Sequence, residues 1–231
     1  YDKKEGYSFN KPFLNEKFID REYSSIYRTN EQGLRIPQNQ SFNRKVENVD
    51  WLVIGDSYTQ GAQVQFKDLY TSLLNRYFAD KIVVNSGISG AGVSHEFNYF
   101  IKDSHRFKPS LVVLQLCSFN DFMNVEPVKS SISGTLFSKS SVFQILLRDI
   151  HYQDPRELPL GRWTEPFRAD RNANINSNIF FKESTVNKKA EIRLMENYLV
   201  HLKAATEAVG AELLVMLIPS REQVDRKSLK E

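Results

Sequence analysis

Apolar residues gather along this chain into four short runs of strand length. The runs cover residues 51–54, 82–85, 111–116 and 213–218, and their apolar positions are successive rather than alternate. Strands with this pattern are buried on both faces, as in a parallel sheet that is covered by helices on each side. The runs therefore predict the strands of a central parallel sheet.

Between the runs lie segments with the three- to four-residue spacing of amphipathic helices. Apolar side chains recur at this spacing in three sets: Leu69, Leu73, Leu74 and Tyr77; Val93, Phe97, Phe100 and Ile101; and Ile192, Met195, Leu199 and Leu202. The last helix should span residues 188–209, because Gly210 follows where a C-terminal cap is expected. Alternating strands and helices predict an α/β fold, a flavodoxin-like three-layer α/β/α arrangement around the parallel sheet.

Two regions depart from this alternation. Residues 1–50 are polar and aromatic, with a short extended piece around a glycine turn at 27–35, and are interpreted as a lead-in that packs on the main domain, residues 51–231. An insertion at about 124–187 carries several prolines and an asparagine-rich passage without a convincing period. It is either a substrate-facing lid, since long irregular loops in compact domains are often functional, or a small subdomain without a functional role.

Composition narrows the classes of partner. With 31 Lys and Arg against 28 Asp and Glu, the net charge of +3 is small and dispersed, which argues against a nucleic-acid partner. The single cysteine, Cys117, follows an apolar run, so it makes no intrachain disulfide and is expected to be a small core residue. No segment approaches the roughly 18 successive apolar residues of a membrane span. The cysteine content does not decide the compartment.

Polar and glycine residues with potential chemistry follow three of the predicted strands directly. They are Ser57, the pair Gly87 and Gly90, and the pair Asn120 and Asp121. The carboxyl ends of parallel strands meet at one edge of a sheet, where ligands bind. A serine in a tight turn at the start of a helix has the setting of a nucleophile. A backbone N–H at the serine, another at a glycine and an asparagine amide would suit the oxyanion of acyl transfer.

The motifs Gly55-Asp56-Ser57, Asn-x-Gly-x-x-Gly at 85–90 and Asn120-Asp121 resemble the first three blocks of the SGNH hydrolases, also called GDSL-type esterases and lipases. The resemblance covers residues 51–121, and residues 213–218 resemble the next core strand of that family. It implies an SGNH hydrolase fold with Ser57 as the nucleophile. It further implies an oxyanion hole made by the N–H groups of Ser57 and Gly90 and the side chain of Asn120. Asp56 would hold the turn by hydrogen bonding rather than transfer protons.

The chain departs from the family pattern in two places. Ser118 replaces the usual glycine of the third block, and the family's general base, a histidine in Asp-x-x-His near the C-terminus, does not occur. The four histidines, His95, His105, His151 and His201, are each assigned to helix surfaces or caps, and His95 is expected to face solvent. His151 is the least implausible substitute base, because the insertion could fold over the edge of the sheet.

The end of the sequence suggests that part of the fold is lacking. Only thirteen residues follow Ile218, and most are polar or charged, so they cannot supply another strand and helix. A sheet that ends at 213–218 would expose an apolar edge. We therefore expect that the last strand and helix, with the Asp-x-x-His, are missing from this chain.

Two functional hypotheses remain. The first is serine-dependent ester hydrolysis or acyl transfer through an acyl-enzyme, on a small-molecule or carbohydrate ester such as an O-acetylated sugar, without cofactor or metal. The second is a non-catalytic SGNH-like domain that binds a glycan or a protein partner. Nucleotide binding is disfavoured, because neither Gly-x-Gly-x-x-Gly nor a Walker-type motif occurs. The resemblance suggests an extracytoplasmic or membrane-anchored location, and nothing indicates the oligomeric state.

Overall fold

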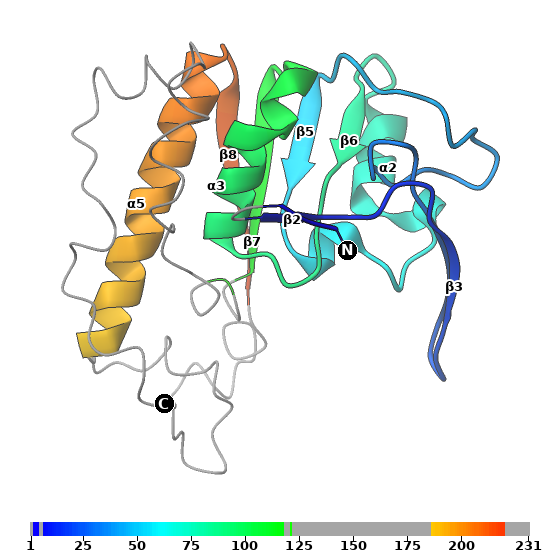
Figure 1. Cartoon of the computed structure of the whole chain (residues 1–231), viewed down its shortest axis with the longest axis horizontal. Coiled ribbons are helices and arrows are strands. Elements are labelled where there is room, and N and C mark those ends of the chain that lie inside the picture. Colours follow the sequence, from blue (N-terminus) through cyan, green and yellow to red (C-terminus); the bar gives the residue numbers. More distant parts are fainter. Residues whose placement is uncertain (1, 5–6, 118–120, 122–185, 220–231) are drawn as a thin grey trace.

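The described part of the chain folds around a four-stranded parallel sheet (Figure 1). This computed structural model describes residues 2–4, 7–117, 121 and 186–219. The strands are β5 (Trp51–Ile54), β6 (Val83–Asn85), β7 (Leu111–Cys117) and β8 (Glu212–Ile218), in the order β6-β5-β7-β8. All three neighbouring pairs are parallel. The order reverses at β5, as it does in flavodoxin-like sheets, so the predicted α/β fold is confirmed.

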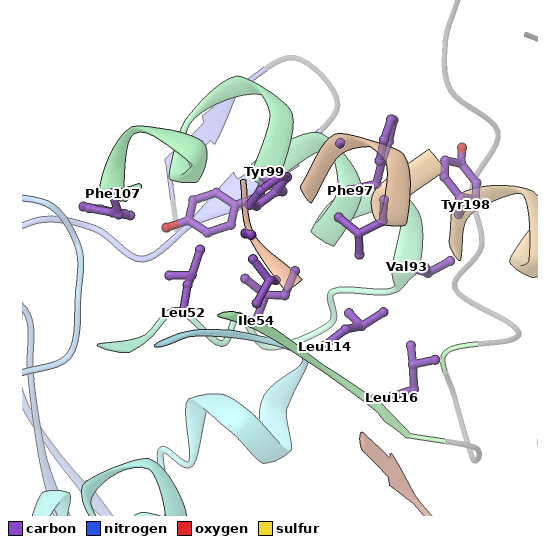
Figure 2. Close-up of a cluster of buried hydrophobic side chains, with 14 of the residues drawn as sticks. Leu52, Ile54, Val93, Phe97, Tyr99, Phe107, Leu114, Leu116 and Tyr198 are labelled. Carbon is purple, nitrogen blue, oxygen red and sulfur yellow. The ribbon is translucent and has the colours of Figure 1, made fainter. Parts of the chain in front are cut away.

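Helices cover both faces of the sheet, because the strands carry apolar residues at successive positions. Leu52 and Ile54 of β5 pack with α3 (Val93–Lys102) and α5 (Val186–Ala208) in the main core, part of which Figure 2 shows. Val53, between them in the sequence, lies in a second cluster with partly buried residues of α2 (Tyr70–Tyr77). Adjacent residues of a strand point to opposite faces, so burial of all three requires cover on both sides.

The predicted helices form, but one predicted apolar face is wrong in part. On α2, Leu74 packs on the sheet, whereas Leu73 exposes 46% of its surface and Tyr77 83%. The ring of Tyr77 lies edge-on to Phe78, its neighbour in the chain, instead of entering the core. α5 ends near the predicted position, and Gly210 takes the left-handed conformation, with φ 78°, that a helix cap favours.

The edge strand β8 is more exposed than its sequence predicts. Leu214, Val215 and Leu217 expose 52%, 43% and 55% of their surfaces, so cover on both faces is not found within the described residues. No helix in the described part of the chain is long and apolar enough to cross a membrane. The insertion at about 124–187 lies outside the described residues, except that α5 begins at Val186.

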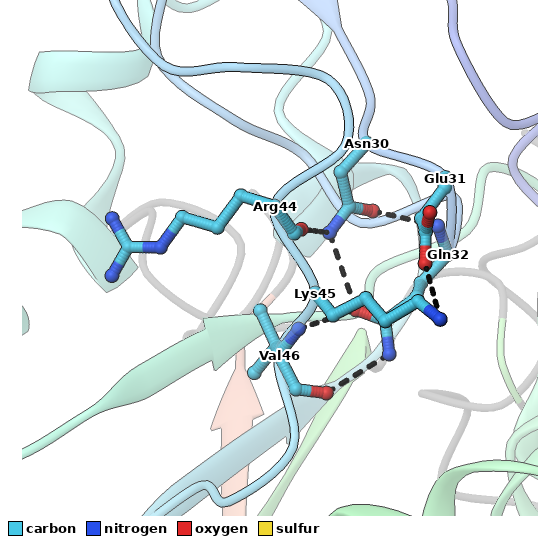
Figure 3. A network of polar contacts seen from close by, with 6 residues as sticks. All are labelled: Asn30, Glu31, Gln32, Arg44, Lys45 and Val46. Carbon is cyan, nitrogen blue, oxygen red and sulfur yellow. Dashed lines mark hydrogen bonds and ion pairs between the residues drawn. The ribbon is translucent and has the colours of Figure 1, made fainter.

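The residues before β5 form the N-terminal arm, residues 1–50, of which 2–4 and 7–50 are described. The arm contains two antiparallel strand pairs, β1 (Asp2–Lys4) with β2 (Tyr7–Phe9) and β3 (Asn15–Ile19) with β4 (Ser24–Arg28). After β4 the chain turns at Gly33, whose φ is 74°, and an antiparallel β-bridge joins Thr29 to Arg35. Side-chain amides of Asn30 and Gln32 bind backbone groups near Arg44 and Val46 and hold the arm together (Figure 3).

The N-terminal arm is packed onto the α/β layers. Leu34 and Val49 are buried in the main core, and strand β2 lies against α3. The short helices α1 (Ser57–Gln60), η1 (Phe66–Asp68) and η2 (Ser104–Phe107) complete the described elements. Of these, α1 follows the carboxyl end of β5 and carries the predicted nucleophile.

Candidate active site

Ser57 lies at the start of α1, directly beyond the carboxyl end of β5. Asp56 is fully buried, and its carboxylate accepts a hydrogen bond of 2.9 Å from the N–H of Tyr58. The helix closes after one turn at Gly61, whose φ is 59° and whose N–H donates to the Ser57 carbonyl at 2.9 Å. Ser57 itself is exposed. Its backbone is therefore held from both sides while its side chain lies at the surface, where a solute can reach it.

The backbone at Gly55 passes close to a buried polar group that the sequence analysis missed. A Cβ at Gly55 would lie 2.5 Å from the Thr59 hydroxyl and 2.7 Å from the Gln115 Oε1 atom. Gln115 is fully buried on β7 and accepts a hydrogen bond of 2.7 Å from Thr59, whose hydroxyl also lies 2.8 Å from that of Tyr70. The only signal for this group in the sequence is a glutamine inside an apolar run. It ties the serine turn to the adjacent strand.

The loop after β6 lies beside the serine turn. Asn85 accepts a hydrogen bond of 3.0 Å from the N–H of Gly87, and its amide donates to the Thr59 carbonyl at 2.6 Å. A Cβ at Gly87 would lie 2.2 Å from the backbone nitrogen of Gln60, so this glycine allows the loop and α1 to touch. Gly90 differs, because it is exposed, has a φ of 76°, and has no atom within 4 Å of an added Cβ.

Gly87 and Gly90, which both follow β6, therefore have different structural roles. Gly87 is a contact point between two loops, and Gly90 supplies a left-handed turn on open surface. The third predicted group, Asn120, lies outside the described residues, as does Ser118. Its neighbour Asp121 is described and fully buried, and it accepts a hydrogen bond from the N–H of Cys117. Cys117 is itself buried, as the sequence predicted.

The expectation that His95 faces solvent is wrong in part, because its side chain is half-buried. Its Nδ1 atom is buried without a hydrogen-bond partner among the described residues. The side chain helps to line a small cavity beside the serine turn, with Ile54, Gly55, Ser86, Glu96 and Tyr99. The prediction treated α3 as a surface helix with one buried face, whereas β2, α5 and η2 all lie against it. Contacts with these three elements therefore bury most of the side of α3 that was expected to face solvent.

The other described histidines lie apart from the serine turn. His105, in η2, places its Nδ1 atom 3.3 Å from the carbonyl oxygen of Phe100. His201 packs its ring beside Phe97 of α3, and burial lowers the pKa of its imidazole. His151 lies outside the described residues. No hydrogen bond joins any of the three described histidines to Ser57.

Three buried carboxyl groups, those of Asp56, Glu96 and Asp121, influence one another electrostatically. Burial, together with the charges of Asp121 and Asp56, raises the pKa of Glu96 well above its usual range. Burial and the charge of Asp56 raise the pKa of Asp121 to about 8, against the opposing effect of its hydrogen bond from Cys117. Both oxygens of Glu96 and the Oδ1 atom of Asp121 have no hydrogen-bond partner among the described residues. Asp121 is therefore expected to carry a proton at neutral pH, and the pKa of Glu96 is shifted in the same direction.

The raised pKa of Asp121 predicts that stability falls as the pH rises. Asp121 of the unfolded chain ionises near 3.8, whereas the folded protein keeps its proton until about pH 8. Raising the pH through this window favours the unfolded chain, so the free energy of unfolding should decrease from pH 4 to pH 8. The isosteric variant Asp121→Asn should flatten this profile and be more stable than wild type at pH 8, by about 1–3 kcal/mol.

Thermal unfolding of both proteins at several pH values measures the effect. Groups elsewhere in the chain titrate in both, so only the difference between the two profiles bears on Asp121. Parallel profiles would contradict the assignment of a proton to this carboxyl.

Within the described residues, no group of three or more His, Cys, Asp or Glu side chains is placed to hold a metal ion.

Comparisons with known proteins add little to this description of the site. No family model and no curated protein matches the chain. Four solved chains do match, among them the crystal structure of TesA, with 18% sequence identity and a TM-score of 0.41. That match covers 78% of this chain and 66% of the TesA chain, so this chain spans slightly less than two thirds of its length.

Proposed function

We propose that this chain is a serine-dependent esterase or acyltransferase of the SGNH type, with Ser57 as its nucleophile. The observation that carries the proposal is the position of an exposed serine in a turn held on both sides, at the carboxyl end of a central parallel strand. The glycine loop after the neighbouring strand β6 lies against that turn. Ligands of open α/β sheets bind at this edge, next to the reversal of strand order.

In the proposed reaction, the Ser57 hydroxyl attacks the carbonyl carbon of an ester. An Oγ–C bond forms while the serine proton passes to a general base, and the oxyanion is stabilised by N–H groups of Ser57 and Gly90 and the amide of Asn120. The bond to the alcohol then breaks, and the alcohol oxygen takes up a proton. Water, or the hydroxyl of an acceptor, attacks the acyl-enzyme and releases Ser57. The proposal assigns the base to none of the described histidines.

The setting of Asp56 supports this division of roles. Its carboxylate is fully buried and accepts a hydrogen bond from the backbone of α1. A carboxylate in that position caps the helix and fixes where Ser57 lies. Asp56 is accordingly proposed as a supporting residue for the turn. O-acetylated carbohydrate is one candidate substrate, and the domain organisation, an arm over residues 1–50 and a hydrolase-like domain over 51–231, belongs to the same proposal.

Labelling with a fluorophosphonate probe tests the proposal directly. The probe phosphonylates serines that an active site activates. Peptide mapping should therefore find the label on Ser57 of the folded protein, and heat-unfolded protein should not be labelled. Ser110 is a suitable internal control, since it is also exposed but precedes β7 at the opposite edge of the sheet. A label found equally on Ser110, or absent from Ser57, would contradict the proposal and favour a non-catalytic domain that binds a glycan or a protein.

A further inference from the structure

The N-terminal arm reaches the edge of the sheet where Ser57 lies. Asn10 is 94% buried, since only 6% of its surface is exposed. Its side-chain amide donates a hydrogen bond of 3.1 Å to the Gly87 carbonyl, and its Oδ1 atom accepts one of 2.8 Å from the side chain of Gln60. One asparagine thus joins the loop after β6 to the last residue of α1. Both partners are at least 50 residues away in the sequence.

A second residue of the arm holds the same short helix. Arg35 exposes only 6% of its surface, and its guanidinium donates to the carbonyls of Gln60 at 2.9 Å and Gly61 at 2.5 Å. These are the carbonyl groups that a helix leaves without partners at its C-terminal end, where a positive charge is also favoured. The guanidinium lies over the ring of Tyr27, 4.8 Å from its centre, so its own position is fixed by the arm.

The parts of the arm that carry Asn10 and Arg35 pack against each other. Gly33 turns the chain in the left-handed conformation, and a Cβ there would lie 2.2 Å from the carbonyl oxygen of Asn10. The turn that precedes Arg35 therefore packs directly on the backbone of Asn10. By contrast, α1 is a single turn of four residues, and so short a helix has almost no stability of its own in water. The position of α1 must come from its neighbours.

We propose that the N-terminal arm sets the spacing between the serine turn and the glycine loop, with Asn10 and Arg35 as positioning residues for the reaction at Ser57. The effect on reactivity rests on the proposed function, whereas the effect on loop position does not. Ser57 and Gly90 belong to the two segments that Asn10 joins. A shift of about 1 Å between a nucleophile and its oxyanion donors can lower a rate by about a hundredfold.

The test compares Asn10→Ala with a matched variant, Asn75→Ala, in the full chain. Asn75 of α2 makes the same kind of bridge, donating to the Val83 carbonyl at 2.6 Å and accepting from the Val83 N–H at 2.8 Å. That bridge lies at the start of β6, the end of the strand opposite the serine turn. A second variant, Asn10→Asp, keeps the acceptor for Gln60 but places a buried carboxyl oxygen against the Gly87 carbonyl, so it breaks the contact with the glycine loop.

Two measurements are made on each variant. Hydrogen exchange reports the backbone amides of Gln60, Gly61 and Ile88, which are all hydrogen-bonded in the folded protein. We expect Asn10→Ala to speed exchange at these amides at least about tenfold, and Asn75→Ala to speed it at Val83 instead. The rate of fluorophosphonate labelling of Ser57 should fall about tenfold or more in both Asn10 variants, and less than about twofold in Asn75→Ala.

The outcomes separate the two proposals. Unchanged exchange at Gln60, Gly61 and Ile88 in both Asn10 variants would overturn the positioning role, whatever the labelling shows. Faster exchange with an unchanged labelling rate would overturn the link to reactivity. A wild-type protein without label on Ser57 would refute the proposed function, while the exchange data still decide whether the arm positions the two loops. Equal losses of labelling in Asn10→Ala and Asn75→Ala would show that the arm only contributes to stability in general, and would overturn its specific role in positioning Ser57.

Discussion

Ser57→Ala is expected to remove hydrolysis of p-nitrophenyl acetate by this protein. The wild-type chain should release a burst of p-nitrophenolate as the serine is acylated, because this leaving group departs without needing a proton. Alanine has no oxygen to accept the acyl group, so the rate should fall to that of the solution without protein, a loss of at least about a hundredfold. Absorbance of p-nitrophenolate, followed before the steady state with substrate in excess, measures the rates of the wild type and the variant.

The matched variant is Ser110→Ala, which removes a hydroxyl from the opposite edge of the sheet. The Ser110 hydroxyl donates to the Asp50 carbonyl at 2.9 Å, so its loss should cost some stability and leave the burst intact. A Ser57→Ala protein that keeps the wild-type burst would show that another residue is acylated. The assignment of Ser57 would then be wrong, even if the protein proves to be an esterase.

Gly87→Ala is expected to cause the largest loss of stability among the substitutions at the site. The new Cβ would lie 2.2 Å from the backbone nitrogen of Gln60 and 2.6 Å from the backbone carbonyl carbon of Thr59. Backbone atoms cannot rotate away as a flexible side chain can, so α1 and the loop after β6 must separate. We expect the free energy of unfolding to fall by more than about 3 kcal/mol, as in the more severe cases of overpacking.

Gly90→Ala provides the control, since it adds the same methyl group three residues further along the same loop. No atom lies within 4 Å of that position, so the cost is limited to the left-handed conformation, about 1–2 kcal/mol. Urea unfolding of the wild type and both variants measures the difference. Equal losses at the two glycines, or a larger one at Gly90, would contradict the close contact between α1 and the loop after β6.

Much of the fold could be predicted from the sequence because burial leaves a local record. Residues 51–54 and 111–116 are apolar at successive positions, and both became central strands covered on two faces. The same reasoning failed where a neighbour far along the chain decides exposure. Tyr77 has the spacing of a core residue and is exposed, whereas His95 has polar neighbours and is half-buried, with its Nδ1 atom enclosed.

The candidate site shows the same division. The sequence by itself determined which residues stand at the carboxyl ends of the strands, because a parallel sheet brings those ends together whatever the rest of the chain does. It could not distinguish the contact glycine Gly87 from the open Gly90, or find that Gln115, Asn10 and Arg35 brace the serine turn. Those contacts join residues far apart in the chain, and a hydrogen bond between distant segments leaves no periodic pattern in either segment. Only the tertiary structure decided them.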